Sequence, residues 1–330
     1  VGSEMCIRDR DKTAKGLFWG GVSNGVQQLL GMLFGIYLAR TLNAEDYGLV
    51  GMLAIFSGIA STIINSGFSV ALTNKLDATH KDYNAVFWFS FVVSICLYIV
   101  LFFSAPLIAS FYDRQELVNL SRVIFASFLF SGMAIVPHVI LFKQLQVKMQ
   151  AKIDVFALFL SGMCGVLLAF NGFAYWALAI QSTVYVASAS LLKWMVVSWR
   201  PSLDFSIEPL KEMFPFSVKL FLTNIFQQVN NNVFSVLLGK LYNANVLGYY
   251  SQGNKWMTMG GSMLNNMINS VAQPVFVQVN DDLERQRNVF RKMVRFAAFV
   301  SFPAMLGLAF VAEEFICATT VSYTHLTLPT

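Results

Sequence analysis

Long apolar stretches alternate with short polar segments along most of this chain, and each is close to the length of a membrane-spanning helix. A helix needs about 20 predominantly apolar residues to cross a bilayer. The candidate stretches are Leu17–Leu38, Tyr47–Leu72, Ala85–Ile108, Leu117–Phe142, Val155–Phe170, Phe173–Val197, Phe214–Leu238, Val246–Val275 and Val289–Val311. Only Asn171 and Gly172 separate the fifth stretch from the sixth, which predicts a tight turn at one membrane face. The pattern predicts an all-α polytopic membrane bundle of about nine helices.

The first and seventh stretches carry an internal repeat, because residues 16–48 match residues 216–248 at one fixed offset without gaps. The identical pairs are Asn24 and Asn224, Gln27 and Gln227, Gln28 and Gln228, Phe34 and Phe234, Leu38 and Leu238, Asn43 and Asn243, Ala44 and Ala244, and Gly48 and Gly248. Such repeats are typical of membrane transporters. Six predicted spans separate the two starts, so both copies cross in the same direction. The repeat therefore predicts two lobes related by an axis along the membrane normal.

The charged residues predict the orientation. Fifteen Lys and Arg residues fall in segments on one side of the predicted bundle and four on the other. Because cytoplasmic loops carry the excess of Lys and Arg, the amino end is predicted to be cytoplasmic. Only 12% of the residues are charged, against about 25% in an ordinary soluble protein. The net charge of +5 is spread over short loops, which does not indicate nucleic-acid binding. The basic run from Arg285 to Arg295 is expected to lie near anionic membrane lipids.

The two ends of the chain do not read as native protein. The sequences VGSEMCIRDR and VSYTHLTLPT are translations of DNA that contains reverse-complementary copies of one element, and this DNA resembles sequencing-library adapters. We therefore assign residues 1–10 and 321–330 to non-native sequence and expect the natural chain to continue. The predicted organisation is a six-helix lobe at residues 11–200, a cytoplasmic linker at 201–212 and part of a second lobe, with three helices, at 213–320.

Polar side chains recur at helical spacing within the first, seventh and eighth stretches. Inside a membrane such residues either face a hydrated cavity or hydrogen-bond to a neighbouring helix, and both interpretations stay open. Lys219 could reach the cytoplasmic surface, whereas Lys255 lies about 14 Å from the nearer predicted helix end at 1.5 Å per residue. A buried lysine would favour an anionic group such as a diphosphate. The candidate cavity residues are Lys219, Lys255, Asn24, Gln28, Gln227, Asn231 and Asn265.

Two further titratable residues, His138 and Asp154, lie in or beside predicted spans. His138 follows Pro137 and could either relay protons or be a packed, hydrogen-bonded histidine beside a kink. Asp154 is predicted to lie at a helix end, so the spans would be nearly free of carboxylates. The sequence contains no catalytic triad pattern, Gly-rich phosphate loop or metal-ligand spacing, and its four cysteines show no disulfide or metal pattern. We therefore expect neither an enzyme nor a resident cofactor or metal.

Several stretches of this chain resemble a known transporter family. They include DKTAKGLFWGG, LARTLNAEDYGLVGM, INSGFSVAL, DYNAVFWF, APLIASFY, GFAYWALAIQ, LGYYSQGNKW and FPAMLGLA. They resemble the polysaccharide transporters of the multidrug/oligosaccharidyl-lipid/polysaccharide exporter superfamily, above all the flippases for O-antigen and colanic-acid type repeat units. The resemblance covers nearly all of residues 11–315.

The resemblance implies two six-helix lobes around a central cavity in the bacterial inner membrane. It also implies that an undecaprenyl-diphosphate-linked oligosaccharide is moved to the outer leaflet by alternating access, driven by H⁺ or Na⁺. Lys219 and Lys255 match positions at which such proteins commonly carry lysine.

Two alternatives remain at this point. A drug or cation antiporter of the same superfamily would be expected to carry a carboxylate within a span. A membrane polymerase or glycosyltransferase would be expected to show a large outer loop or clustered catalytic residues, and neither is present in the sequence.

Overall fold

The computed structural model describes residues 2–65, 67–75, 77–144, 146–203, 206–259, 261 and 283–320. All regular structure in these ranges is helical, which confirms the predicted all-α fold. The helices are α1 (Gly2–Thr41), α2 (Ala44–Met52), α3 (Ala54–Asn65), α4 (Phe68–Asn74), α5 (His80–Tyr112), α6 (Glu116–Lys143), α7 (Val147–Phe170), α8 (Ala174–Val196), α9 (Glu208–Leu241), α11 (Leu283–Phe310) and α12 (Ala312–Thr320). Residues 244–259 form a further helical segment.

Four spans in the described part of the chain are long and apolar enough to cross a membrane. They are Ala44–Asn74, which combines α2, α3 and α4, and the single helices His80–Tyr112, Glu116–Lys143 and Val147–Phe170. They coincide with the second to fifth stretches predicted from the sequence. The total of about nine spans stays a prediction.

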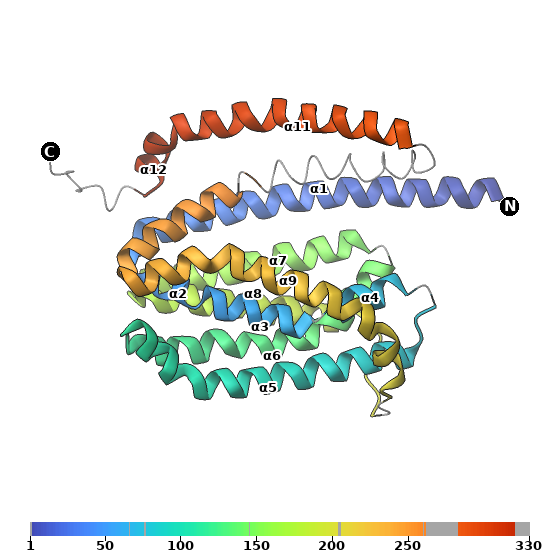
Figure 1. The fold of residues 1–330 in the computed structure, drawn as a ribbon, viewed down its shortest axis with the longest axis horizontal. Helices are drawn as coiled ribbons and strands as arrows, with labels where there is room; N and C mark the ends of the chain where they lie inside the picture. The colour runs from blue at the N-terminus through green and yellow to red at the C-terminus, as the bar shows by residue number, and fades with distance from the viewer. Residues whose placement is uncertain are drawn as a thin grey trace. The chain divides into compact units, whose positions relative to one another are not determined.

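The contacts divide the chain into two units, Val1–Tyr249 and Tyr250–Thr330. In the first unit α6 packs against α5 and α8, α8 packs against α7, and α7 packs against α1. The helix α9 lies along α2, α3 and α4, as the ribbon in Figure 1 shows, and it also contacts α5. In the second unit α11 contacts α12, and the rings of Trp256 and Phe315 meet edge to face with their centroids 5.2 Å apart. The predicted lobe boundaries at residues 200 and 213 stay predictions.

The helix α6 forms the centre of the first unit. Its side chains Leu117, Leu120 and Phe125 are fully buried. Gly132 lies so close to Ser94 of α5 that a Cβ at this position would overlap the serine side chain. The small residue therefore allows the two long helices to approach closely, as is common between membrane helices.

The second predicted span is one crossing made of three helical segments, whereas the sequence predicts a continuous helix. The first break is at Leu53, and the second is at Gly67, whose φ of 74° is left-handed. A Cβ on Gly67 would overlap the backbone of Ser217 in α9. Glycine thus permits both the left-handed turn and the close approach of α9.

The turn predicted at Asn171 and Gly172 is confirmed. The helix α7 ends at Phe170 and α8 begins at Ala174. Gly172 has a φ of 78°, and its N–H donates to the Ala169 carbonyl at 3.0 Å. This left-handed glycine brings α7 and α8 together as an antiparallel pair.

Candidate functional site

The two copies of the repeat meet directly at one end of the first unit. Asn43 is the N-cap of α2, and its N–H donates to Asp46 Oδ2 at 2.8 Å. Asn243 plays the same part in the second copy, where its Oδ1 accepts from the N–H of Val246 at 2.9 Å. Each asparagine thereby starts a helix that carries a small residue in its first turn and a glycine four positions later.

These small residues contact one another reciprocally. A Cβ on Gly48 would collide with the carbonyl of Ala244, and a Cβ on Gly248 would collide with the carbonyl of Ala44. The backbones of the two copies therefore touch, and each copy presents the same surface to the other. This is the isologous geometry of a two-fold contact. We call Ala44, Gly48, Ala244 and Gly248 the glycine clasp.

Ion pairs reinforce the same end of the unit. Asp113, in the turn between α5 and α6, pairs with Lys240 of the second repeat copy at 3.3 Å. The next residue, Arg114, pairs with Glu45 of the first copy at 2.8 Å. One short turn therefore links both copies. Because these side chains are largely exposed, each pair contributes about 0–1 kcal/mol and sets position more than stability.

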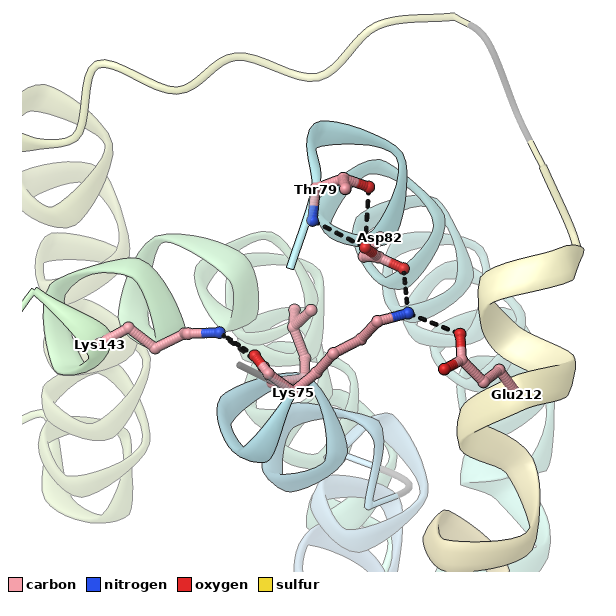
Figure 2. A network of polar contacts seen from close by, with 6 residues as sticks. Lys75, Thr79, Asp82, Lys143 and Glu212 are labelled. Atoms are coloured by element: carbon pink, nitrogen blue, oxygen red, sulfur yellow. Dashed lines mark hydrogen bonds and ion pairs between the residues drawn. The ribbon is translucent and has the colours of Figure 1, made fainter. Parts of the chain in front are cut away.

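A second polar network closes the opposite end, where α9 begins (Figure 2). The Nζ of Lys75 lies 2.6 Å from Glu212 Oε2 of α9 and 3.0 Å from Asp82 Oδ1 of α5. The other carboxylate oxygen of Asp82 accepts from the N–H and the hydroxyl of Thr79 at 2.7 and 2.8 Å. Lys143 Nζ donates to the carbonyls of Leu72 and Lys75.

Lys75 is thus the centre of this network. Its hydrogen bonds to Glu212, and then to Asp82, raise its pKa above the usual 10.5. The ammonium group of Lys75 ties the start of α9 to the end of α4 and the start of α5.

The segment after α8 is fixed to the start of α5 at this end. Trp88 Nε1 donates to the Ser202 carbonyl at 2.7 Å, and the N–H of Ser202 donates to Asn84 Oδ1 at 3.0 Å. Trp199 Nε1 lies 3.0 Å from His80 Nδ1. The connection that leads to α9 therefore begins from an anchored position.

The predicted cavity residues of α9 share an exposed face. Lys219, Gln227 and Asn231 are exposed, and Gln227 Nε2 donates to Asn231 Oδ1 at 2.9 Å. A different face of α9 packs on the second predicted span, where Ser217 meets Gly67 and Gln228 meets Gly58. Within a membrane an exposed polar face needs water or polar partners. The arrangement suits one wall of a hydrated path, and the role of these residues stays a prediction.

The other predicted residues are placed less closely. Asn24 is exposed on α1, and Gln28 is half-buried. Lys255 is exposed in the helical segment 244–259 and belongs to the second unit, whereas Lys219 belongs to the first. Asn265 lies outside the described residues.

Comparison with known proteins identifies the family. The model of the family described as polysaccharide biosynthesis protein matches residues 37–322. The chain belongs to this family. Among curated members of similar sequence, the teichuronic acid biosynthesis protein TuaB of Bacillus subtilis (strain 168) is 29% identical over 78% of this chain and 54% of its own length. The lipopolysaccharide biosynthesis protein WzxC of Escherichia coli (strain K12) is 23% identical over 93% of this chain and 63% of its own length.

The chain thus spans between half and two thirds of the length of these family members. Its fold is similar to that of the lipid II flippase MurJ in an inward closed conformation, with a TM-score of 0.68. The match covers 92% of this chain and 67% of MurJ at 15% identity, so it shows the fold alone. Together with the apolar helices, these comparisons identify a multi-pass membrane protein of the polysaccharide biosynthesis protein family.

The structure also corrects one prediction for this family member. Asp154 does not lie at a helix end, because α7 begins at Val147 and Asp154 is within a candidate membrane span. Its Oδ1 lies 3.8 Å from Nζ of Lys193 in α8. The polar segment before Asp154 suggested a loop in the sequence, but it folds as the first two turns of α7. The sequence pattern also did not predict the polar network at Lys75, because Lys143 and Glu212 lie 68 and 137 positions from Lys75 in the chain.

Proposed function

We propose that this protein moves an undecaprenyl-diphosphate-linked oligosaccharide from the cytoplasmic to the outer leaflet of the bacterial inner membrane. Membership of the polysaccharide biosynthesis protein family supports this proposal. So do relatives named for the biosynthesis of two surface polymers and the fold shared with a lipid II flippase. The observation that carries the mechanism is the reciprocal contact of Gly48 with Ala244 and of Gly248 with Ala44.

A reciprocal contact of this kind suits a joint between two lobes that alternate in access. With the amino end in the cytoplasm, as the loop charges predict, the glycine clasp lies at the outer face and the Lys75 network at the inner face. Opening to the outside separates the clasp. Opening to the inside separates Glu212 from Lys75. The exposed polar face of α9, with Lys219, then borders the path, and Lys255 engages the diphosphate as a point charge. Either H⁺ or Na⁺ would drive the cycle.

The second candidate function is that of a drug or cation antiporter of the same superfamily. It is favoured by one observation, the position of Asp154 within a candidate span. Its pairing with Lys193 weakens the case, because a lysine beside a carboxylate opposes the binding of a cationic drug. The fold is shared by a lipid II flippase and by a multidrug resistance MATE family transporter, and no observation supports a membrane polymerase or glycosyltransferase.

The test uses a strain from which the gene for this protein has been deleted. We expect the deletion to remove surface polysaccharide and to leave lipid-linked repeat units at the inner leaflet, and the intact gene to restore display. Lys255→Ala should reduce display, while Lys255→Arg should retain part of it. Lys292→Ala is the matched control, since that lysine is also exposed and lies on α11 of the same unit. Unchanged surface polysaccharide in the deletion strain, with increased drug sensitivity, would favour the antiporter.

A further inference from the structure

Three partly buried titratable side chains come from neighbouring helices of the first unit. Asp154 comes from α7, Lys193 from α8 and His138 from α6. The side chains of Lys193 and Asp154 are only 13% and 21% exposed. Asp154 lies seven residues, or about 10 Å, along α7 from its first residue. Charged groups at such positions cost free energy and usually mark ion or proton pathways.

From this group we infer that Asp154, paired with Lys193, is the site at which the coupling proton binds. The inference rests on the proposed function, since it names the ion that drives the transport. A proton that arrives binds to the Asp154 carboxylate and makes it a neutral acid. The Lys193 ammonium then loses its counter-charge and can leave the pair. When the proton departs, the carboxylate recaptures the ammonium.

The geometry suits a reversible pair. The distance of 3.8 Å between Nζ and Oδ1 is longer than a direct hydrogen bond, so no strong bond opposes protonation. Holding two charges in a buried place costs several kcal/mol in desolvation, which lowers the gain from keeping both ionised. A proton can therefore change this pair more readily than it would change an exposed or tightly bonded one.

The groups that face the pair are few. On α8, Tyr185 is close enough to Asp154 for the two to interact electrostatically. On α6, His138 lies within the field of Lys193, and its Nδ1 is 3.0 Å from Nε2 of Gln150 on α7. On α1, which also packs against α7, Tyr37 is the one titratable residue between Trp19 and Arg40.

These groups favour a proton over a metal cation. Na⁺ and other hard cations need several oxygen ligands. Here the carboxylate faces an ammonium group, whose positive charge opposes a bound cation. Among the described residues, no group of three or more His, Cys, Asp or Glu side chains could hold a metal ion.

The position of Lys193 connects the site to the movement of the lobes. Lys193 lies three residues before α8 ends at Val196. Its neighbour Trp194 donates from Nε1 to the Met133 carbonyl of α6 at 3.0 Å. The chain then continues into the segment that is held on α5 by Trp199 and Ser202 and that leads to α9. Release of Lys193 from Asp154 would therefore change the end of α8, from which the segment that leads to α9 begins.

The test combines a spectroscopic and a cellular measurement on the complete protein. In phosphatidylethanolamine–phosphatidylglycerol vesicles, infrared difference spectra recorded during a pH titration should show the carbonyl band of a buried carboxylic acid. Asp154→Asn should remove this band and Asp154→Glu should shift it. Asp113→Asn, from the exposed pair with Lys240, should leave it in place. A wild-type protein without the band, or a band that persists in Asp154→Asn, overturns the inference.

The double variant Asp154→Asn, Lys193→Gln separates coupling from folding. Removing both members of a buried pair avoids the cost of leaving one charge alone. We expect this variant to reach the membrane at the wild-type level and to display no surface polysaccharide. If the double variant displays surface polysaccharide at the wild-type level, the pair is structural only and the inference is wrong. Loss of display with the wild-type gene, while the band is present, would instead refute the proposed flippase function.

Discussion

Replacing Gly48 with alanine should open the outer end of the protein. The added Cβ would collide with the Ala244 carbonyl, and backbone cannot move aside as a flexible side chain can. Inserting a methyl group into a tight contact costs about 1–3 kcal/mol. The better helix propensity of alanine does not offset this cost, because the helix is formed in both the closed and the open state. Even the lower figure, about 1 kcal/mol against the closed clasp, raises the open population about fivefold.

The reciprocal contact also makes a prediction for the second glycine of the clasp. Because the clasp is reciprocal, Gly248→Ala should have nearly the same effect as Gly48→Ala. Gly31→Ala is the matched control, since nothing lies within 4 Å of a Cβ at that position in α1. It should leave the clasp unchanged.

Thiol labelling measures the opening. Leu247 lies beside Gly248 and is fully buried, so a Leu247→Cys reporter is protected while the clasp is closed. The reporter is placed in a protein whose native cysteines are replaced by serine, and a membrane-impermeant maleimide is added to intact cells. Labelling should accelerate in both glycine variants and stay slow in the control. Equal labelling rates in all three variants would refute the clasp as the outer closure.

Two further predictions concern α9 at its inner end. Glu212→Gln and Lys75→Gln should each weaken the inner closure by about 0–1 kcal/mol. A double-mutant cycle, measured on the thermal stability of the detergent-solubilised protein, should show a coupling energy between the two residues. Added salt should reduce this coupling energy. Because the pKa of Lys75 is raised, the stability that its ion pair contributes should be complete below pH 10.5 and should disappear as the pH rises through the raised pKa. Loss of the coupling between Lys75 and Glu212 at neutral pH would contradict this prediction. Gly67→Ala should lower thermal stability by more than about 1–2 kcal/mol, because its φ of 74° is left-handed and its Cβ would meet Ser217, whereas an unchanged melting temperature would exclude strain at this turn.

Much of the fold follows from local sequence. The apolar stretches predict the helices because a bilayer fixes their length, and Gly172 predicts the turn between α7 and α8 because it can adopt a positive φ. The break at Gly67 could not be predicted in this way. It depends on the approach of Ser217, which is distant in the chain.

In the candidate site, too, the features that depend on local sequence could be predicted and those that depend on distant residues could not. The polar face of α9 is visible in the sequence, because Lys219, Gln227 and Asn231 are spaced along one helix. The pairs that hold the unit together, such as Lys75 with Glu212, join residues 137 positions apart and leave no local pattern. Asp154 was misplaced because the polar residues before it hide the true start of α7.

The glycine clasp also bears on how such a protein could arise. Each half of the contact is made by the same short sequence, an asparagine cap followed by alanine and glycine on one face of a helix. A half-length ancestor with this sequence could bind a second copy of itself without any new residue. Gene duplication and fusion would then join two subunits whose surfaces were already complementary. A later substitution of either glycine would disturb the contact that both repeat copies share.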